Sequence, residues 1–269
     1  MTKCETRGVE RIKERWNSHA NTFDEWYKTF TGAVENFVDW ELLKTHLPQN
    51  KNAKILDAAG GTGRVTLPLA KLGYSLTLCD LSPRMLDVAR QKLRREGLLE
   101  KIEVLECDIR DLRFADESFD FVLCWDGFTE DTEGLAIKEL ARVTKAGGRI
   151  SVFLNNKWAT AINSFCENPA SVLTLIKSSP SYFEDDEGKR RVVSMEEIGT
   201  LFDAIRIRVI DIYAVCGWLN VLRIPETVAK SRNWDEEFFQ QTTEMVLKLS
   251  KEPSVRGMSR HLVLYGEKY

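Results

Sequence analysis

Apolar residues recur along the chain in short runs separated by longer segments of mixed polarity. Five runs have the length of a buried strand: Lys54–Asp57, Ser75–Asp80, Ile102–Glu106, Phe119–Cys124 and Arg149–Leu154. The segments between them carry helical spacing, which is typical of a chain that alternates strand and helix. Because parallel strands need such crossovers, the pattern predicts a doubly wound sheet.

Helix signals lie where this alternation requires them. Ser82 and Pro83 suit the N-cap and first position of a helix that continues to about residue 96. Helices are also predicted over 64–72, 131–144, 195–204 and 234–250, and two further strands over 205–213 and 261–266. Residues 155–193 do not continue the alternation of strand and helix, so an insertion at the ligand-binding edge of the sheet is expected there.

The first fifty residues are predicted to be helical and are rich in aromatic side chains. Trp16, Phe23, Trp26, Phe30 and Phe37 recur at spacings of three, four and seven, which places an apolar stripe on a helix.

Composition and charge narrow the class of protein. A formal net charge of −3 over 269 residues argues against a dedicated nucleic-acid surface, although local basic patches stay possible. No apolar run approaches the roughly 18–20 residues that span a bilayer, and the charged start lacks a secretory signal, so a cytoplasmic location without membrane contact is expected. The six cysteines form no CxxC pair, which favours reduced thiols, and the three histidines are too scattered to predict a metal site.

Three aspartates end three successive predicted strands: Asp57, Asp80 and Asp108. Ligands of open α/β sheets bind at this edge, and Asp80 stands where a carboxylate accepts ribose hydroxyl groups. The segment ILDAAGGTGR contains the end of the first strand and the glycine-rich turn that follows it. Thr66, however, occupies the third glycine position of a dinucleotide fingerprint. A carboxylate at Asp57 is unfavourable beside pyrophosphate but favourable beside an ammonium or sulfonium group. The turn therefore favours S-adenosylmethionine, a cationic nucleoside without phosphate.

Five segments in order carry a family resemblance: ILDAAGGTGR, LTLCDLSPRMLDVAR, ECDIRDL, FDFVLCWDG and ELARVTKAGGRISVF. Over about residues 54–154 the chain resembles the class I S-adenosylmethionine-dependent methyltransferases, of the methyltransferase type 11-like kind. The resemblance implies an enzyme with S-adenosyl-L-methionine as cofactor and S-adenosyl-L-homocysteine as product. It also implies a Rossmann-like, doubly wound, seven-stranded and mostly parallel sheet whose last strand is antiparallel, with a helical N-terminal lid and a cap.

The resemblance also implies roles for single residues. Asp57 and the turn would hold the methionine part, Asp80 the ribose, and Asp108 the adenine amino group. The full set of cofactor-binding candidates is Asp57, Ala59, Gly61, Gly63, Asp80, Leu81, Met85, Asp108, Ile109, Cys124 and Trp125. Ala59 departs from the family pattern D-x-G-x-G-x-G. Because alanine is strained at positive φ, we expect a negative φ at this residue.

The methyl acceptor is less well defined than the cofactor. The strand-four segment CWDG lacks the motif of methyltransferases that act on exocyclic amines of nucleic acids, which disfavours that reaction. The acceptor-binding candidates are Trp16, Phe23, Trp26, Tyr27, Phe128, Asn155, Trp158, Arg260 and His261. His19 and Asp126 are candidate general bases, although a surface histidine and a loop-capping aspartate are equally consistent with the pattern.

Three functions stay open at this point. The favoured one is methylation of a small molecule, with the attacking O, N or S atom unresolved. The C-terminal segment around Glu252, Arg260 and His261 is similar to the methyltransferase that esterifies a wobble-uridine carboxylate in tRNA, so a tRNA substrate is the alternative. A non-catalytic S-adenosylmethionine-binding protein is the third. The expected division is a lid (1–50), a cofactor-binding core (51–154), a cap insertion (155–193) and a C-terminal completion of the core (194–269).

Overall fold

The computed structural model describes residues 3–125, 133–185, 188–215 and 224–269. Its strands are β1 (Lys54–Ala58), β2 (Ser75–Asp80), β3 (Ile102–Glu106), β4 (Phe119–Cys124), β5 (Thr144–Asn156), β6 (Ser181–Asp185), β7 (Gly188–Val193), β8 (Ile207–Val215) and β9 (His261–Lys268). Its longer helices are α1 (Lys3–His19), α2 (Phe30–His46), α4 (Pro83–Arg95), α5 (Glu133–Val143), α7 (Pro169–Lys177), α8 (Met195–Asp203) and α11 (Glu236–Lys251). The shorter helices are η1 (Phe23–Lys28), α3 (Thr66–Lys71), η2 (Leu99–Lys101), α6 (Lys157–Ser164), α10 (Glu226–Ala229) and α12 (Pro253–Arg256).

The strands form one mixed sheet whose central part is parallel. The order β3-β2-β1-β4-β5 is parallel throughout, β9 lies antiparallel to β5, and β8 lies antiparallel to β9. These seven strands and the antiparallel last strand confirm the predicted fold class.

The prediction of seven strands is nevertheless wrong for the whole sheet, which has nine strands in the described residues. The hairpin β6–β7 adds two, because Val192 and Val193 pair in parallel with Asn155 and Asn156 at the end of β5. Its sequence mixes charged with apolar residues and therefore did not show a clear strand pattern. Strand β5 also begins at Thr144, five residues before the predicted start at Arg149.

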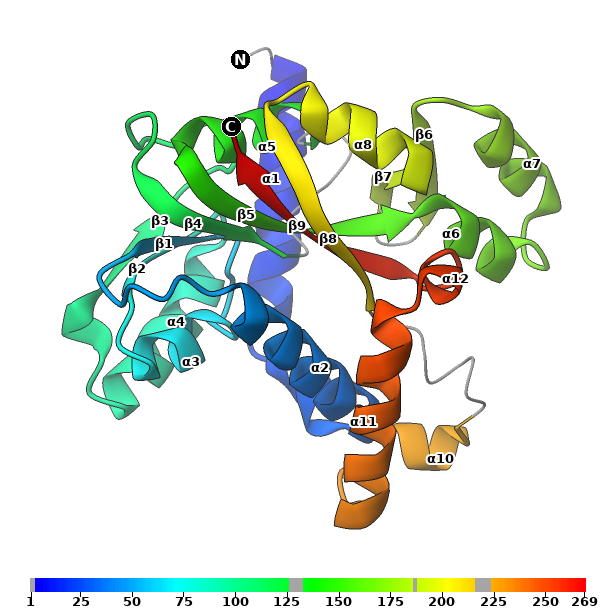
Figure 1. Ribbon diagram of the computed structural model, residues 1–269, viewed down its shortest axis with the longest axis horizontal. Helices are drawn as coiled ribbons and strands as arrows, with labels where there is room; N and C mark the ends of the chain where they lie inside the picture. The colour runs from blue at the N-terminus through cyan, green and yellow to red at the C-terminus, as the bar shows by residue number, and fades with distance from the viewer. Residues whose placement is uncertain (1–2, 126–132, 186–187, 216–223) are drawn as a thin grey trace.

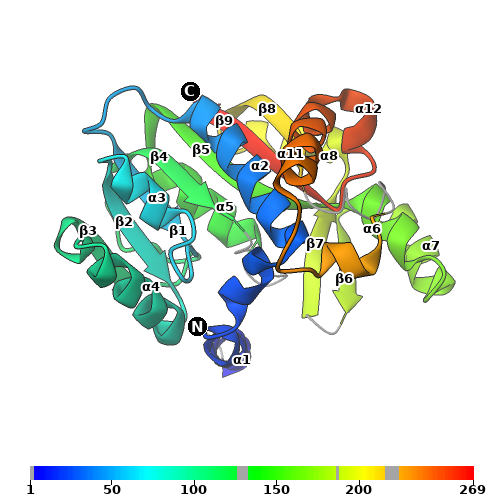
Figure 2. The same cartoon turned by 90° about the horizontal axis from the view of Figure 1, so that it is seen from below.

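Two hydrophobic clusters cover the two faces of the sheet. One contains residues of α2, α3, α4 and α11, and the other contains residues of α5 and α8. Figure 1 shows the first group of helices below the sheet and the second above it, and Figure 2 shows α2 and α11 side by side. This three-layer packing leaves the carboxyl edge of the parallel strands for a ligand.

The start of α4 follows the predicted chemistry. The Ser82 hydroxyl accepts a hydrogen bond from the Met85 backbone N–H at 3.1 Å, and Pro83 occupies the first helical position. The cap fixes the loop between β2 and α4, which carries cofactor-binding candidates.

No helix within the described residues is long and apolar enough to cross a membrane. Those residues also contain no group of three or more histidine, cysteine, aspartate or glutamate side chains placed to hold a metal ion.

Candidate functional site

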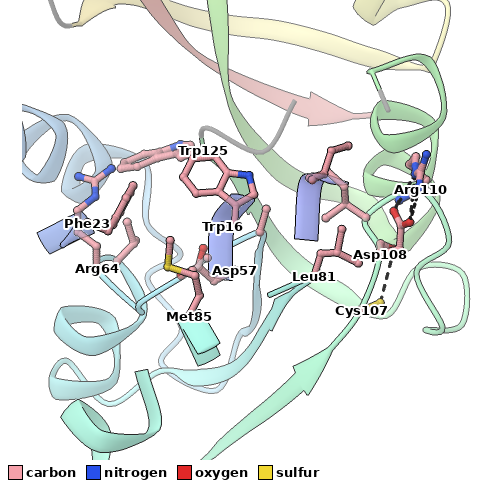
Figure 3. Close-up of a pocket in the computed structure, with 16 residues that line it drawn as sticks. Trp16, Phe23, Asp57, Arg64, Leu81, Met85, Cys107, Asp108, Arg110 and Trp125 are labelled. Atoms are coloured by element: carbon pink, nitrogen blue, oxygen red, sulfur yellow. Dashed lines mark hydrogen bonds and ion pairs between the residues drawn. The ribbon is translucent and has the colours of Figure 1, made fainter. Parts of the chain in front are cut away.

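A cleft lies at the carboxyl edge of β1, β2 and β4. It is lined by Ile12, Trp16, Phe23, Asp57, Ala59, Gly60, Gly61, Arg64, Val65, Leu81, Met85, Cys107, Asp108, Ile109, Arg110 and Trp125. In Figure 3, Phe23, Arg64 and Trp125 gather at one end and Asp108 with Arg110 at the other. Eight of the eleven predicted cofactor-binding residues are thus brought to one cleft.

Asp57, the second-last residue of β1, is a buried carboxyl group that is only 3% exposed. The Thr66 hydroxyl donates a hydrogen bond to Oδ2 at 2.6 Å. Burial raises the pKa of Asp57 to about 6, although the Thr66 hydrogen bond and the positive charge of Arg64 oppose that rise. A cationic ligand at this carboxylate would favour its ionised form.

Asp80 presents a second buried carboxyl group at the end of β2. The Gly61 backbone N–H donates to its Oδ2 at 3.0 Å, and the Ser82 backbone N–H donates to its Oδ1 at 2.8 Å. Burial raises the pKa of Asp80 to about 6 against these hydrogen bonds. The two backbone donors fix the carboxylate against the glycine turn, although Asp80 itself is not among the residues that line the cleft.

The glycine turn departs from our prediction at Ala59, whose φ is +55°. The predicted negative φ is therefore wrong. The Gly60 N–H donates to the Cys79 carbonyl at 3.1 Å, so the backbone on both sides of Ala59 stays bound to β2. Alanine in this left-handed conformation costs about 1–2 kcal/mol.

Gly63 lies off the cleft. Its φ of +73° favours glycine, and a Cβ there would lie 3.3 Å from the Cβ of Ala89 on α4. The structure therefore gives Gly63 a packing contact between the turn and α4. Cys124, another predicted cofactor residue, is fully buried and also lies off the cleft.

Asp108 is held by a residue that our sequence-based reasoning missed. Arg110 donates from Nε to Asp108 Oδ1 at 3.0 Å and from Nη2 to Oδ2 at 2.6 Å. Burial disfavours the charge of Asp108, but the hydrogen bonds from Arg110 outweigh burial and hold its pKa below the usual value. The pair forms a charged end wall next to the apolar side chains of Leu81 and Ile109.

Arg64 is a second missed residue, although it stands in the quoted motif GTGR. Its Nη1 lies 3.2 Å from Asp39 Oδ2 and 3.2 Å from Asn36 Oδ1, both on α2. Its guanidinium lies over the rings of Tyr27 and Trp125, at 4.6 and 5.5 Å from their centroids. The cleft therefore offers a cation near the carboxylate of Asp57.

Aromatic side chains from distant segments form one wall of the cleft. Trp125 stacks on Phe153 with ring centroids 4.6 Å apart, and its indole N–H donates to the Ser151 hydroxyl at 3.0 Å. Trp16 and Phe23 meet edge to face at 6.0 Å. Because Trp125 is fixed by both contacts, this wall is a preformed apolar surface.

The N-terminal segment is held over the cleft by polar contacts to the cofactor-binding loops. Asp24 accepts from the Thr62 hydroxyl at 2.7 Å and pairs with Lys92 Nζ at 2.6 Å. Asn17 accepts from the Ser82 hydroxyl at 2.7 Å. These contacts join the segment to the glycine turn and to the start of α4.

The other predicted residues do not line the cleft. These are Trp26, Tyr27, Asn155, Trp158, Arg260 and His261. His19 is exposed, and its Nδ1 lies 2.8 Å from the Arg15 carbonyl. Asp126 and Phe128 lie outside the described residues.

Comparison with known proteins identifies the fold and its cofactor class. Residues 55–148 match the family model described as "Methyltransferase domain". This chain contains a class I S-adenosylmethionine-dependent methyltransferase domain. The match covers the glycine turn, the three strand-end aspartates and the fixed Trp125, and it confirms the predicted family and cofactor.

Curated relatives share this part of the chain. The ubiquinone/menaquinone biosynthesis C-methyltransferase UbiE of Pectobacterium carotovorum is 34% identical over 106 residues, which cover 38% of this chain and 42% of that protein. UbiE of Pseudomonas fluorescens is 30% identical over 165 residues, covering 60% and 64%. The chain thus matches less than two thirds of the length of either relative.

Solved structures share the fold of this chain, both within residues 55–148 and beyond them. The [4+2]-cyclase SpnF aligns with a TM-score of 0.64 at 16% identity, over 97% of this chain and 96% of its own. A SAM-dependent methyltransferase of Methanosarcina mazei aligns with a TM-score of 0.56 at 19% identity, over 84% and 96%. Since a cyclase shares this architecture, the fold alone does not define the reaction.

Proposed function

We propose that the chain is an S-adenosylmethionine-dependent methyltransferase whose acceptor is a small, planar and largely apolar molecule. The cofactor, when bound, supplies an activated methyl group. Asp57 would bind its ammonium group and Arg64 its carboxylate, while Asp80 would accept hydrogen bonds from the ribose. Leu81, Ile109 and the Asp108–Arg110 pair would hold the adenine.

The fit of the residues to this cofactor supports the assignment. Asp57 and Asp80 are buried carboxyl groups with a pKa of about 6, so a cation is the ligand charge that stabilises them as carboxylates. The turn also brings Gly61, which has no side chain and a φ of +53°, to the wall of the cleft. A pyrophosphate would be repelled by the same carboxylates.

The aromatic wall is the observation that carries the acceptor class. Trp16, Phe23 and Trp125 give this part of the cleft an apolar aromatic surface, in which the ring planes of Trp16 and Phe23 are 78° apart. A planar conjugated ring fits such a surface by stacking. The names of the UbiE relatives describe C-methylation in quinone biosynthesis, so we infer an electron-rich, quinol-like ring that is methylated at carbon and loses the replaced ring proton to water.

The chain's own residues would act on such an acceptor by orientation and by exclusion of water. Trp125, fixed by Ser151 and Phe153, sets the plane of the ring, and the N-terminal segment closes the cleft above it. Fixed geometry and a dry site are the main requirements of an in-line displacement at an activated carbon. The general-base roles of His19 and Asp126 stay predictions, as does the division of the chain into lid, core and cap.

The experiment is a methyl-transfer assay with radiolabelled S-adenosylmethionine and four acceptor groups: quinols, simple phenols, carboxylic acids and tRNA. We expect transfer to a quinol and its loss in Trp125→Ala, while the substitution Trp158→Ala, outside the cleft, leaves it unchanged. Transfer to tRNA alone would contradict the proposal and support the macromolecular alternative, whose candidates Arg260 and His261 do not line the cleft.

A further inference from the structure

A cysteine lines the cofactor cleft without a part in the proposed reaction. Cys107 directly follows β3, is partly buried, and precedes the cleft residues Asp108 and Ile109. Its sulfur lies 3.6 Å from the Asp108 carbonyl and 3.8 Å from the Asp111 carbonyl. The thiol is therefore part of the loop that forms the adenine end of the cleft.

A second thiol stands next to Cys107 on the neighbouring strand. Cys79 on β2 is fully buried, and both cysteines belong to the same hydrophobic cluster on one face of the sheet. The Cys107 backbone N–H donates to the carbonyl of Asp80, the residue after Cys79, at 3.0 Å. The two side chains thus lie side by side where the strands end.

Cys79 favours the thiolate form of Cys107, whereas the Asp108 and Asp111 carbonyls accept hydrogen bonds from its thiol form. A hydrogen bond from the Cys79 thiol lowers the pKa of Cys107 to about 7 against the effect of burial, with help from the Arg113 backbone and charge and opposition from Asp108. The same interaction and complete burial raise the pKa of Cys79. Cys79 is thus the donor and Cys107 the nucleophile.

We propose that Cys107 is a modification site for hydroperoxides and soft electrophiles, and that its modification blocks the cofactor cleft. The inference rests on the proposed function for its consequence but not for the reactivity of the thiol. With a hydroperoxide, the thiolate sulfur forms an S–O bond as the O–O bond breaks. The sulfur is oxidised to a sulfenic acid, and the leaving hydroxide or alkoxide takes a proton from water.

Modification changes the cleft because Cys107 lines it and its sulfur contacts the Asp108 and Asp111 carbonyls at 3.6 and 3.8 Å. An added oxygen or carbamidomethyl group must displace the 108–111 loop or extend into the space beside Leu81 and Ile109. Either outcome disturbs the surface that we assign to adenine. Bound S-adenosylhomocysteine should in turn shield Cys107 from reagents.

The test measures alkylation by iodoacetamide at pH 7 for each cysteine by mass spectrometry. Cys166 is exposed and serves as a reference within the same chain. Thiolate fraction and nucleophilicity together predict that Cys79→Ala slows labelling of Cys107 about threefold, whereas Cys79→Ser, which keeps a donor, slows it less. S-adenosylhomocysteine should slow the labelling of Cys107 at least fivefold and leave the labelling rate of Cys166 unchanged. Prior treatment with hydrogen peroxide should reduce the labelling of Cys107 by the same factor.

The outcomes separate this proposal from the proposed function. If S-adenosylhomocysteine raises the melting temperature but does not protect Cys107, or if Cys107 reacts no faster in the wild type than in Cys79→Ala, the proposal is wrong. If Cys107 reacts as expected but S-adenosylhomocysteine gives neither stabilisation nor protection, the cofactor assignment fails instead. Alkylation should abolish S-adenosylhomocysteine binding by the wild type but leave the binding by Cys107→Ser at the level of its own untreated sample. Equal binding by alkylated and untreated wild type would refute the blocking step.

Discussion

Substitution of Asp57 by asparagine should weaken cofactor binding and stabilise the free protein at the same time. The carboxyl group is buried, and asparagine keeps one oxygen that can accept from Thr66. It removes the charge that the ligand's ammonium group needs. The two effects have opposite signs because the charge is unfavourable until the cation arrives.

The size of each effect follows from the pKa and from the hydrogen bonds. A pKa of Asp57 raised from 3.8 to about 6 corresponds to an upper limit of about 3 kcal/mol of destabilisation at pH 7 and about half of that at pH 5. The destabilisation is absent below the unfolded pKa of 3.8. It grows as the pH rises toward the folded pKa of about 6 and is complete above that value. Loss of a charge-assisted contact costs about 1.5–3 kcal/mol, or roughly 10- to 150-fold in Kd.

The assay combines urea unfolding at pH 7 and pH 5 with calorimetric titration of S-adenosylhomocysteine. Asp120→Asn is the matched control, because Asp120 lies at the opposite end of the same sheet. Its pKa is lowered by the Lys145 ion pair and the Lys54 backbone despite burial, so its neutralisation should destabilise the protein and leave binding unchanged.

Unchanged affinity in Asp57→Asn would refute the assignment of Asp57 to the cofactor. A loss of stability at pH 7 equal to that of the control would refute the electrostatic reasoning. The reasoning also requires the gain in stability to shrink between pH 7 and pH 5.

Three further predictions concern the turn, the carboxylates and the N-terminal segment. Ala59→Gly should raise the free energy of unfolding by about 1 kcal/mol in urea titrations, since glycine accepts the positive φ; no gain would contradict the strain. The affinity for S-adenosylhomocysteine should fall as the pH drops through about 6, because Asp57 and Asp80 become protonated, and a flat titration profile from pH 5 to 8 would exclude their ionised role. Asp24→Asn should raise KM for S-adenosylmethionine several-fold with a smaller effect on kcat, because it weakens the contacts to Thr62 and Lys92. Glu25→Gln, which affects the ion pairs to Lys28 and Arg232, should leave KM unchanged.

The sequence allowed the core fold and the strand-end carboxylates to be predicted because both follow from local patterns. Asp57 and Asp80 stand at the carboxyl ends of buried strands, and a parallel sheet brings those ends to one edge. Ser82 and Pro83 marked the start of α4 for a similar local reason. None of these predictions required knowledge of distant contacts.

The errors and omissions arose where distant contacts decide the outcome. Ala59 has a positive φ in a segment that is bound to β2, and the sequence pattern around Ala59 does not contain that contact. Arg64 and Arg110 were missed because an arginine in a loop gives no signal until its carboxylate partner is placed beside it. The β6–β7 hairpin was missed because its alternation is hidden by charged residues on the exposed side.

The most direct test of the central claim is a thermal-shift measurement of the wild-type protein with S-adenosylhomocysteine and, separately, with NAD⁺. We predict a concentration-dependent rise in melting temperature with S-adenosylhomocysteine and none with NAD⁺, since the carboxylate of Asp57 disfavours a pyrophosphate. Stabilisation by NAD⁺ without any by S-adenosylhomocysteine would contradict the account.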